Sequence, residues 1–309
     1  MLSLILAAAL LSDPVSTPVT LPSEPAPLHG TLLTPEGPTR AVAVILPGSG
    51  PTDRNGNSPG GLVGSTYRLL AEGLAEQGVA TVRIDKRGVG GSAPAMIAEQ
   101  DLTFQTYIGD ARAWAAEAAR VTGRSCVWLI GHSEGSQIAL AAAQDGNPSV
   151  CGLVLLAGAG RPAGVILRDQ FRAGLPEALL APAFAALDEL EAGRTVVDAP
   201  PELAALFRPS VQPYLISWIG LDPTDLIRTY QGPVMIGQGS TDIQVTTTDA
   251  NALSAARPTA HLVVWEGVNH LLKIAPADRA ANIATYSDPT LPLAPGVVDD
   301  VAGFILQPR

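Results

Sequence analysis

Charged residues are scarce in this chain, and its basic residues are scattered. Only 16% of the 309 residues are charged, whereas 47% are hydrophobic, and the formal net charge is −10. No cluster of Lys or Arg occurs anywhere in the sequence. Nucleic acids and anionic membrane surfaces attract proteins through clustered positive charge, so neither is expected as a partner. The hydrophobic content is sufficient for a full globular core.

Sequence motifs for cofactors and metals are also missing. The chain has no phosphate loop of the Gly-x-x-x-x-Gly-Lys type and no His, Cys and Asp cluster at metal-ligand spacing. We therefore predict no cofactor and no metal site. Only two cysteines occur, Cys126 and Cys151. Neither lies near the motifs described below, so a thiol nucleophile is not expected.

The two cysteines each open an apolar run. If these runs are adjacent parallel strands, both cysteines lie at the same edge of the sheet, about 4.8 Å apart across the strands. That Cα–Cα separation is near the lower end of the range found in disulfides. A disulfide here would be consistent with an oxidising compartment. Two buried thiols are the alternative, and the sequence leaves the choice open.

The first eleven residues, Met1 to Leu11, form an apolar run typical of a signal peptide. The run is too short to span a bilayer, so no stable membrane insertion is expected. A basic region before it is missing, and a packed N-terminal helix in a cytoplasmic protein stays open as the alternative. We predict export to the periplasm or the exterior. Five prolines in residues 12–27 predict a linker, so residues 1–27 are assigned to signal peptide and linker.

A Gly-x-Ser-x-Gly motif, Gly131 to Gly135, stands between an apolar run and an alanine-rich helical pattern. A strand, this pentapeptide and a helix are typical of the nucleophile elbow of serine hydrolases. The turn is so tight that the flanking glycines are needed because they have no Cβ. We predict that Ser133 is the nucleophile, at the positive end of the following helix. The pentapeptide alone is also compatible with an ordinary turn in which Ser133 caps a helix.

The general base follows from the positions of four histidines. His29 precedes the first strong core strand, His132 lies inside the elbow, and His261 opens an apolar run. His270 lies just past the carboxyl end of that run, where catalytic groups gather on a parallel sheet. We therefore predict that His270 is the general base and later the general acid.

The acid that orients His270 should lie between the serine and the histidine in the sequence. The buried run Pro233–Gln238 is followed directly by Gly239-Ser240-Thr241-Asp242. Asp242 thus stands one strand before His270, at the same edge, and is predicted to accept a hydrogen bond from the far imidazole nitrogen. The competing carboxylates are Asp222, Asp225 and Asp249. The first two precede the strand, and Asp249 is predicted to begin or cap a helix.

The oxyanion site should come from an earlier strand end. The apolar run Ala41–Leu46 is followed by a glycine-rich loop, Pro47–Pro51. We predict that the backbone N–H of Ser49, with that of Gly50 close behind it, is the first donor. The N–H of Glu134, the residue after the nucleophile, is the second.

Together these segments resemble the α/β-hydrolase fold family, and within it bacterial serine carboxylesterases. The matching motifs are Gly48-Ser49-Gly50-Pro51-Thr52-Asp53-Arg54, Asp85-Lys86-Arg87-Gly88-Val89-Gly90-Gly91-Ser92, Gly131-His132-Ser133-Glu134-Gly135, Asp242 and His270. Asn55 stands where the carboxylesterase loop more often has Asp. We interpret Asp53, Arg54 and the loop from Asp85 to Arg87 as ion-paired braces rather than as parts of a pocket.

Alternating strand and helix patterns predict a mostly parallel central sheet flanked by helices, the α/β-hydrolase fold. Residues 28–160 and 229–309 form the two parts of this core. Residues 161–228 break the alternation and are predicted to form a small helical cap inserted after the sixth strand of the family's sheet. Its aromatic residues are candidates to face a substrate, although packing of the cap is the preferred interpretation: Phe171, Phe184, Phe207, Tyr214 and Trp218.

The sequence predicts a serine hydrolase that cleaves carboxylic esters of short-to-medium acyl chains through an acyl-enzyme. Its partner would be a small-molecule ester, and the oligomeric state is not indicated. An aminopeptidase-like or amide-cleaving enzyme could use the same triad, with a cap carboxylate holding a substrate amine: Glu177, Asp188, Glu189, Glu191 or Asp222. A thioesterase acting on coenzyme A esters fits worse because the cap has few basic residues. A non-catalytic binding protein is disfavoured because the triad is complete.

Overall fold

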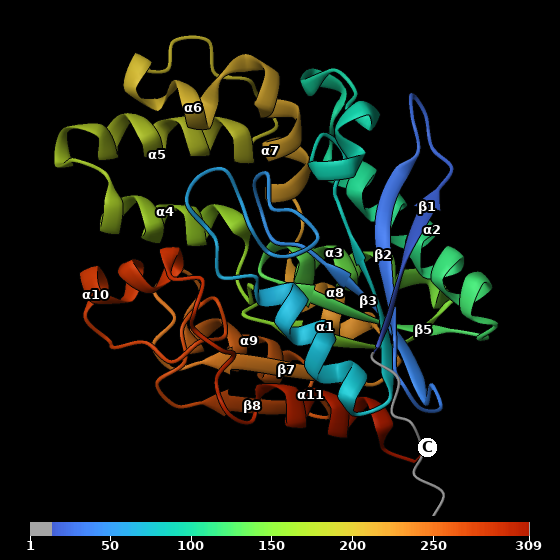
Figure 1. The fold of residues 1–309 in the computed structure, drawn as a ribbon. Coiled ribbons are helices and arrows are strands. Elements are labelled where there is room, and N and C mark those ends of the chain that lie inside the picture. Colours follow the sequence, from blue (N-terminus) through green and yellow to red (C-terminus); the bar gives the residue numbers. More distant parts are fainter. Residues whose placement is uncertain (1–13, 309) are drawn as a thin grey trace, which may run out of the picture.

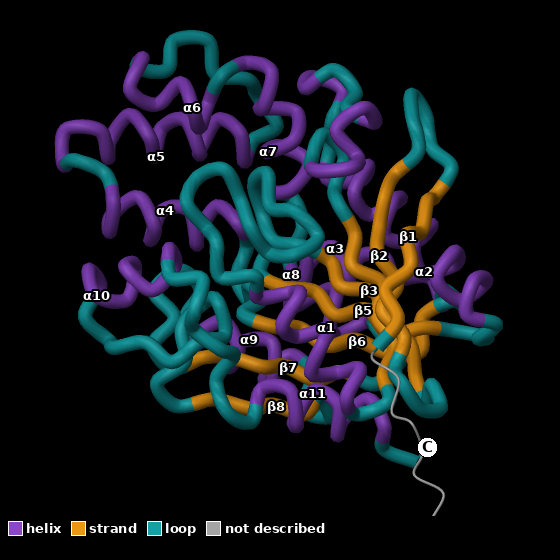
Figure 2. Tube along the Cα trace, viewed as in Figure 1, coloured by secondary structure: helices purple, strands orange, loops and turns teal. Residues whose placement is uncertain are grey.

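The computed structural model describes residues 14–308, which form a central sheet with helices on both faces and a helical cap beside it (Figure 1). Strands and helices alternate along most of the chain, as the α/β pattern predicts (Figure 2). The sheet order is β1-β2-β4-β3-β5-β6-β7-β8. The strand bounds are β1 Val15–Leu21, β2 Leu28–Thr34, β3 Ala41–Leu46, β4 Val79–Ile84, β5 Val127–His132, β6 Val150–Leu156, β7 Val234–Gly239 and β8 His261–Trp265.

The six strands from β4 to β8 in the sheet are parallel, whereas β1 and β2 join antiparallel. The carboxyl ends of parallel strands meet at one edge, so the residues that follow β3, β5, β7 and β8 are brought together there. This edge is where the sequence predicts the site. The predicted α/β-hydrolase fold is confirmed.

The linker predicted over residues 12–27 is wrong for its described part. Val15–Leu21 is strand β1, paired along its whole length with β2, and Val19 and Leu21 are buried. β2 therefore lies between β1 and β4 and is not the edge strand of the sheet. Pro18 favoured the prediction of a linker because proline is excluded from central strands. An edge strand such as β1 tolerates it. The predicted signal peptide, Met1 to Leu11, lies outside the described residues.

The helices cover both faces of the sheet. Helices α2, α3, α8 and α9 pack on one face, and α1 and α11 pack on the other. The helix bounds are α1 Thr66–Glu76, α2 Phe104–Thr122, α3 Glu134–Ala142, α4 Ala163–Gly174, α5 Glu177–Glu191, α6 Ala204–Phe207, α7 Gln212–Ile219, α8 Pro223–Thr229, α9 Thr247–Ala256, α10 Arg279–Ala284 and α11 Val297–Leu306. Short 3₁₀ turns are η1 Gly90–Ala95, η2 Glu99–Asp101, η3 Gln144–Gly146, η4 Pro201–Leu203, η5 Pro209–Val211 and η6 Thr285–Ser287.

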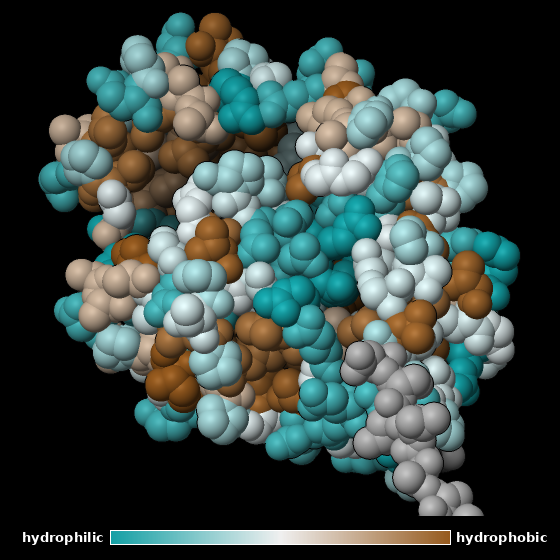
Figure 3. All heavy atoms as spheres, in the orientation of Figure 1, coloured by the Kyte–Doolittle hydropathy of each residue, from teal (hydrophilic) through white to brown (hydrophobic). Residues whose placement is uncertain are grey.

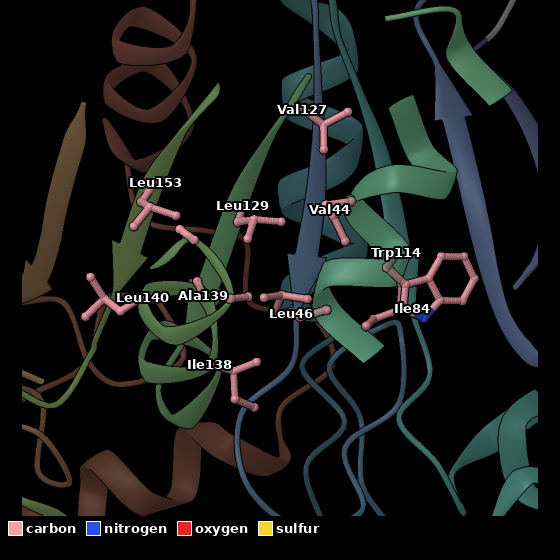
Figure 4. Packing of buried hydrophobic residues seen from close by; sticks show 14 of the residues in the cluster. Val44, Leu46, Ile84, Trp114, Val127, Leu129, Ile138, Ala139, Leu140 and Leu153 are labelled. Atoms are coloured by element: carbon pink, nitrogen blue, oxygen red, sulfur yellow. The ribbon is translucent and has the colours of Figure 1, made fainter. Parts of the chain in front are cut away.

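Helix α3, which follows the Gly-x-Ser-x-Gly motif, is completely buried. Figure 4 shows Ala139 and Leu140 of this helix packed beside Leu129 of β5 and Val44 of β3. Small alanine side chains let the helix axis approach the sheet closely. The close approach fixes where the first turn of α3, and with it the serine, lies.

The segment between β6 and β7 forms the helical cap, with its own small core. Phe171 and Phe207 are buried in that core and contact each other edge to face. Tyr214 and Trp218 of α7 pack against Phe104 of α2, which joins the cap to the main body. These contacts confirm that packing is the main role of four of the predicted cap aromatics. Within residues 14–308, no helix is long and apolar enough to cross a membrane.

A disulfide joins Cys126 and Cys151 at the amino ends of β5 and β6, with Cα atoms 5.2 Å apart. Of the two alternatives left by the sequence, the structure has the bridge. Because it closes a loop of 25 residues far from the serine, its removal should affect stability rather than chemistry. We expect the Cys126→Ser/Cys151→Ser variant to lose about 2–4 kcal/mol of unfolding free energy. Urea unfolding checks the stability, and an unchanged kcat checks the separation from the site.

Candidate active site

Ser133 lies on a sharp turn between β5 and α3, with φ 54° and ψ −123°. Few residues other than glycine adopt positive φ, and such strain gathers at active sites. The two flanking glycines are required by close packing. A Cβ on Gly131 would lie 2.2 Å from the carbonyl oxygen of Gly135, and one on Gly135 would lie 2.3 Å from that of Leu46. The local sequence therefore folds into the elbow geometry that the motif predicts.

His270 and Asp242 are buried and hydrogen-bonded, with 2.7 Å between Nδ1 of the imidazole and Oδ2 of the carboxylate. The other oxygen of Asp242 accepts the backbone N–H groups of Gln244 and Val245 at 2.8 and 3.0 Å. Burial opposes ionisation of Asp242, but His270 and the two N–H groups outweigh it and hold the pKa of the carboxyl below its usual value. An ionised Asp242 accepts the Nδ1 proton, which leaves Nε2 of a neutral His270 free to accept another.

Ser133 and His270 line the same cavity of about 60 Å³. Ser49 lines it too, and a Cβ built on Gly48 would lie 3.2 Å from Cβ of Ser133. The glycine-rich loop after β3 thus lies directly against the serine. The remaining lining residues are Gly48, Thr52, Gly56, Leu62, Thr66, Tyr67, His132, Gln244 and Leu271.

The three residues predicted for the oxyanion site are divided between two cavities. Ser49 lines the cavity with the serine, whereas Gly50 and Glu134 line a second one of about 290 Å³. Cap residues Val211 and Tyr214 also line that second cavity. Glu134 is the first residue of α3, so its backbone N–H has no acceptor within the helix.

A hydrogen-bond chain that the sequence analysis missed connects the loop to the histidine. The Tyr67 hydroxyl accepts the Gly48 N–H at 2.9 Å and lies 2.9 Å from Nδ1 of His132. Nε2 of His132 is 2.7 Å from the carbonyl oxygen of His270. Because a carbonyl only accepts, Nε2 carries the proton and Tyr67 donates to Nδ1. Burial, followed by the nearby His270, lowers the pKa of His132 to about 3, which keeps this imidazole neutral.

Arg54 and Arg87 form ion-paired braces, as predicted, whereas Asp53 braces its own loop through backbone hydrogen bonds. Arg54 binds Asp85 through its backbone N–H and its guanidinium, with the shortest contact at 2.5 Å. Asp53 accepts the backbone N–H groups of Asn55 and Asn57. Arg87 forms a two-pronged ion pair with Asp110. The Arg54–Asp85 contacts hold the long loop after β3 against the loop after β4, and Arg87 holds the loop after β4 to α2.

The competing carboxylates and His261 lie elsewhere. Asp222 caps α8, Asp225 pairs with Arg228, and Asp249 caps α9 while binding Arg161. His261 begins β8 and stacks on Phe304 at the opposite end of that strand from His270.

An eight-stranded, mostly parallel sheet with a serine elbow and a cap defines an α/β hydrolase. The chain belongs to the serine aminopeptidase family, S33, whose model matches residues 63–274. It is thus a hydrolase by family. No curated protein matches the chain.

Many solved structures share the fold. Est1E from Butyrivibrio proteoclasticus, solved with bound ferulic acid, is 18% identical with a TM-score of 0.61, covering 93% of this chain and 96% of its own. An esterase domain from Rhodothermus marinus is 20% identical with a TM-score of 0.54, covering 88% and 95%. Proline iminopeptidase from Mycobacterium smegmatis is 18% identical with a TM-score of 0.55, covering 94% and 97%. At these identities the likeness concerns the fold alone.

Proposed function

We propose that this hydrolase is a serine carboxylesterase that uses Ser133, His270 and Asp242. The observation that carries the proposal is the placement of the strained Ser133 in one cavity with His270, whose Nδ1 is bound to the buried Asp242. Such a nucleophile, base and orienting acid are the parts that acyl transfer requires.

In the proposed reaction, Oγ of Ser133 attacks the ester carbonyl while Nε2 of His270 takes the hydroxyl proton. The carbonyl electron pair moves to the oxygen, which the N–H groups of Ser49 and Glu134 hold as an oxyanion. Collapse of this intermediate expels the alcohol, which receives the proton from His270. Water then repeats the steps and releases the carboxylic acid and free Ser133. Asp242 stabilises the imidazolium in both halves.

The dimensions of the site support short-to-medium acyl chains. The cavity at Ser133 is small, at about 60 Å³, and a second cavity of about 290 Å³ is lined by Gly50, Glu134 and cap residues. Figure 3 shows hydrophobic side chains gathered on the cap around α5, with the surface hollowed below them. A limited space favours an acyl chain of modest length over a long one.

The proposal is tested with p-nitrophenyl esters from acetyl to dodecanoyl. We expect kcat/KM to be highest between about four and eight acyl carbons and to fall by at least about tenfold at dodecanoyl, since a pocket of this size excludes longer chains. A stopped-flow burst of p-nitrophenol equal to the enzyme concentration would indicate an acyl-enzyme. Absence of hydrolysis for every ester would contradict the proposal.

Amide cleavage is the second candidate, because the family is named for an aminopeptidase. It needs a free carboxylate to bind the substrate amine. Most of the cap carboxylates considered for this role already have partners: Asp188 and Glu191 bind Arg168, Glu189 binds Arg194, and Asp222 binds Thr224. Only the exposed Glu177 is left of that set, which favours esters. Aminoacyl p-nitroanilides, assayed beside the esters, distinguish the two.

We also propose that the protein is exported. The support is the Cys126–Cys151 disulfide, because reducing cytoplasmic conditions keep most thiols reduced. Fractionation of the source cells, with non-reducing mass analysis of the recovered protein, tests this. Recovery only from the cytoplasm with two free thiols would contradict it.

A further inference from the structure

Lys86, directly after β4, has an unusual place for a lysine: its side chain is only 6% exposed. Its Nζ donates to the carbonyl oxygen of Gly48 at 2.6 Å and lies 3.4 Å from Oε1 of Glu134. The ammonium also lies 5.2 Å from the centre of the Tyr107 ring. A buried cation is costly unless such partners surround it, so the arrangement calls for a role.

The contact with Gly48 acts on the peptide that contains the first predicted oxyanion donor. The carbonyl of Gly48 and the N–H of Ser49 belong to one planar trans peptide, in which these two groups point in opposite directions. With the carbonyl directed at Lys86, the N–H of Ser49 is directed away from it. Ser49 lines the cavity that contains Ser133, so this direction leads to the reacting carbonyl.

Gly48 is fixed on its other side as well. Its N–H donates to the hydroxyl of Tyr67 at 2.9 Å. A glycine has the widest choice of backbone conformations, so the loop would otherwise lose this orientation easily. Lys86 and Tyr67 therefore hold successive peptides of the loop, one by its carbonyl and the other by its N–H.

Lys86 also joins the two predicted donors of the oxyanion site. Its other partner, Glu134, supplies the second backbone N–H from the start of α3. The ion pair has side chains only 6% and 4% exposed, so solvent screens it little. A charged donor at the Gly48 carbonyl further polarises that peptide, which makes the Ser49 N–H a better donor to an oxyanion.

We propose that Lys86 is a positioning residue of the oxyanion site, which aims and polarises the Ser49 N–H through the Gly48 carbonyl. The inference rests on the proposed function, because it concerns the transition state of acyl transfer at Ser133. It assigns the loop after β4 a function beyond bracing.

The test compares Lys86→Met with the double variant Lys86→Met/Glu134→Gln and with Glu134→Gln alone. Lys86→Met removes the donor but leaves a buried carboxylate unpaired. The double variant removes both charges, so it should fold better than Lys86→Met, which buries an unpaired carboxylate. Any loss of rate in the double variant then reports the loss of the contact between Lys86 and Gly48. Glu134→Gln keeps Lys86 on Gly48 and is the reference that shows the effect of losing the carboxylate alone.

Two readouts are used: kcat and KM for the best p-nitrophenyl ester, and the rate of Ser133 labelling by a fluorophosphonate. In that labelling Oγ attacks phosphorus, fluoride leaves, the proton passes to His270, and the phosphoryl oxygen occupies the oxyanion site. The labelling rate constant is taken from the fraction of chains that finally react, so unfolded protein does not contribute to it. Thermal midpoints are recorded for each variant.

We expect Lys86→Met and the double variant to lose roughly 10- to 100-fold in kcat and labelling rate, somewhat less than the loss of a whole oxyanion donor. KM should stay within about threefold, because the interaction strengthens only in the transition state. The double variant should also be at least about tenfold slower than Glu134→Gln, which retains the contact between Lys86 and Gly48.

Wild-type rates in both Lys86 variants would overturn the inference. So would a slow Lys86→Met with a wild-type-like double variant, because the unpaired Glu134 would then be the cause. A wild type that neither hydrolyses esters nor labels at Ser133 would instead overturn the proposed function, and the inference with it.

Discussion

Ser133→Ala is expected to lower kcat for p-nitrophenyl esters by on the order of 10⁶, the loss typical of a missing nucleophile in a Ser-His-Asp triad. The fold should persist, since the strained turn is held by the packing of its glycines and α3 rather than by the serine hydroxyl. Alanine tolerates this backbone about as well as serine. Circular dichroism and thermal melting check the fold beside the assay.

Ser136→Ala is the matched control for this substitution. Ser136 is buried three residues along on the same helix, and its hydroxyl donates to the carbonyl oxygen of Gly131 at 2.8 Å. Losing that hydrogen bond should cost about 1 kcal/mol of stability and leave kcat within about tenfold. Equal activity of Ser133→Ala and wild type would mean that another group is the nucleophile.

Asp242→Asn is expected to lower kcat by about 10⁴, the size found for the same change in the Ser-His-Asp template. The loop N–H groups of Gln244 and Val245 require an acceptor, so the amide oxygen should face them. The amide NH₂ then faces Nδ1 of His270 and forces its proton to Nε2. In that tautomer the imidazole cannot accept the proton of Ser133.

Kinetics across pH, with Asp225→Asn as the control, check this prediction. Asp225 is an exposed carboxylate paired with Arg228 on α8, so its replacement should leave kcat unchanged. Near-wild-type activity of Asp242→Asn would mean that a different carboxylate orients the histidine.

The sequence was sufficient for features whose cause is local. The elbow depends on two glycines four residues apart, and the structure shows why any side chain there would collide with the backbone. The ends of strands can also be predicted from local patterns. The sequence could therefore predict that Asp242 and His270 lie at the same edge of the sheet, where the parallel strands end. The structure brings these two into direct contact.

The functional residues that the sequence did not predict contact partners that are far away in the sequence. Tyr67 and His132 are 65 positions apart, and Lys86 and Glu134 are 48 apart, so each pairing depends on how α1, β4 and α3 pack. No periodicity or motif in one segment indicates such contacts. β1 was missed for a different reason, since Pro18 is atypical of strands and is tolerated here because β1 lies at the edge of the sheet.

The most direct test of the central claim is mass analysis of the protein after treatment with a fluorophosphonate. The account predicts one adduct per chain, on the peptide that contains Ser133, with none in Ser133→Ala and slow labelling when His270 is replaced by Ala. An adduct on another residue, or equal labelling of wild type and Ser133→Ala, would contradict the assignment of Ser133 as the nucleophile.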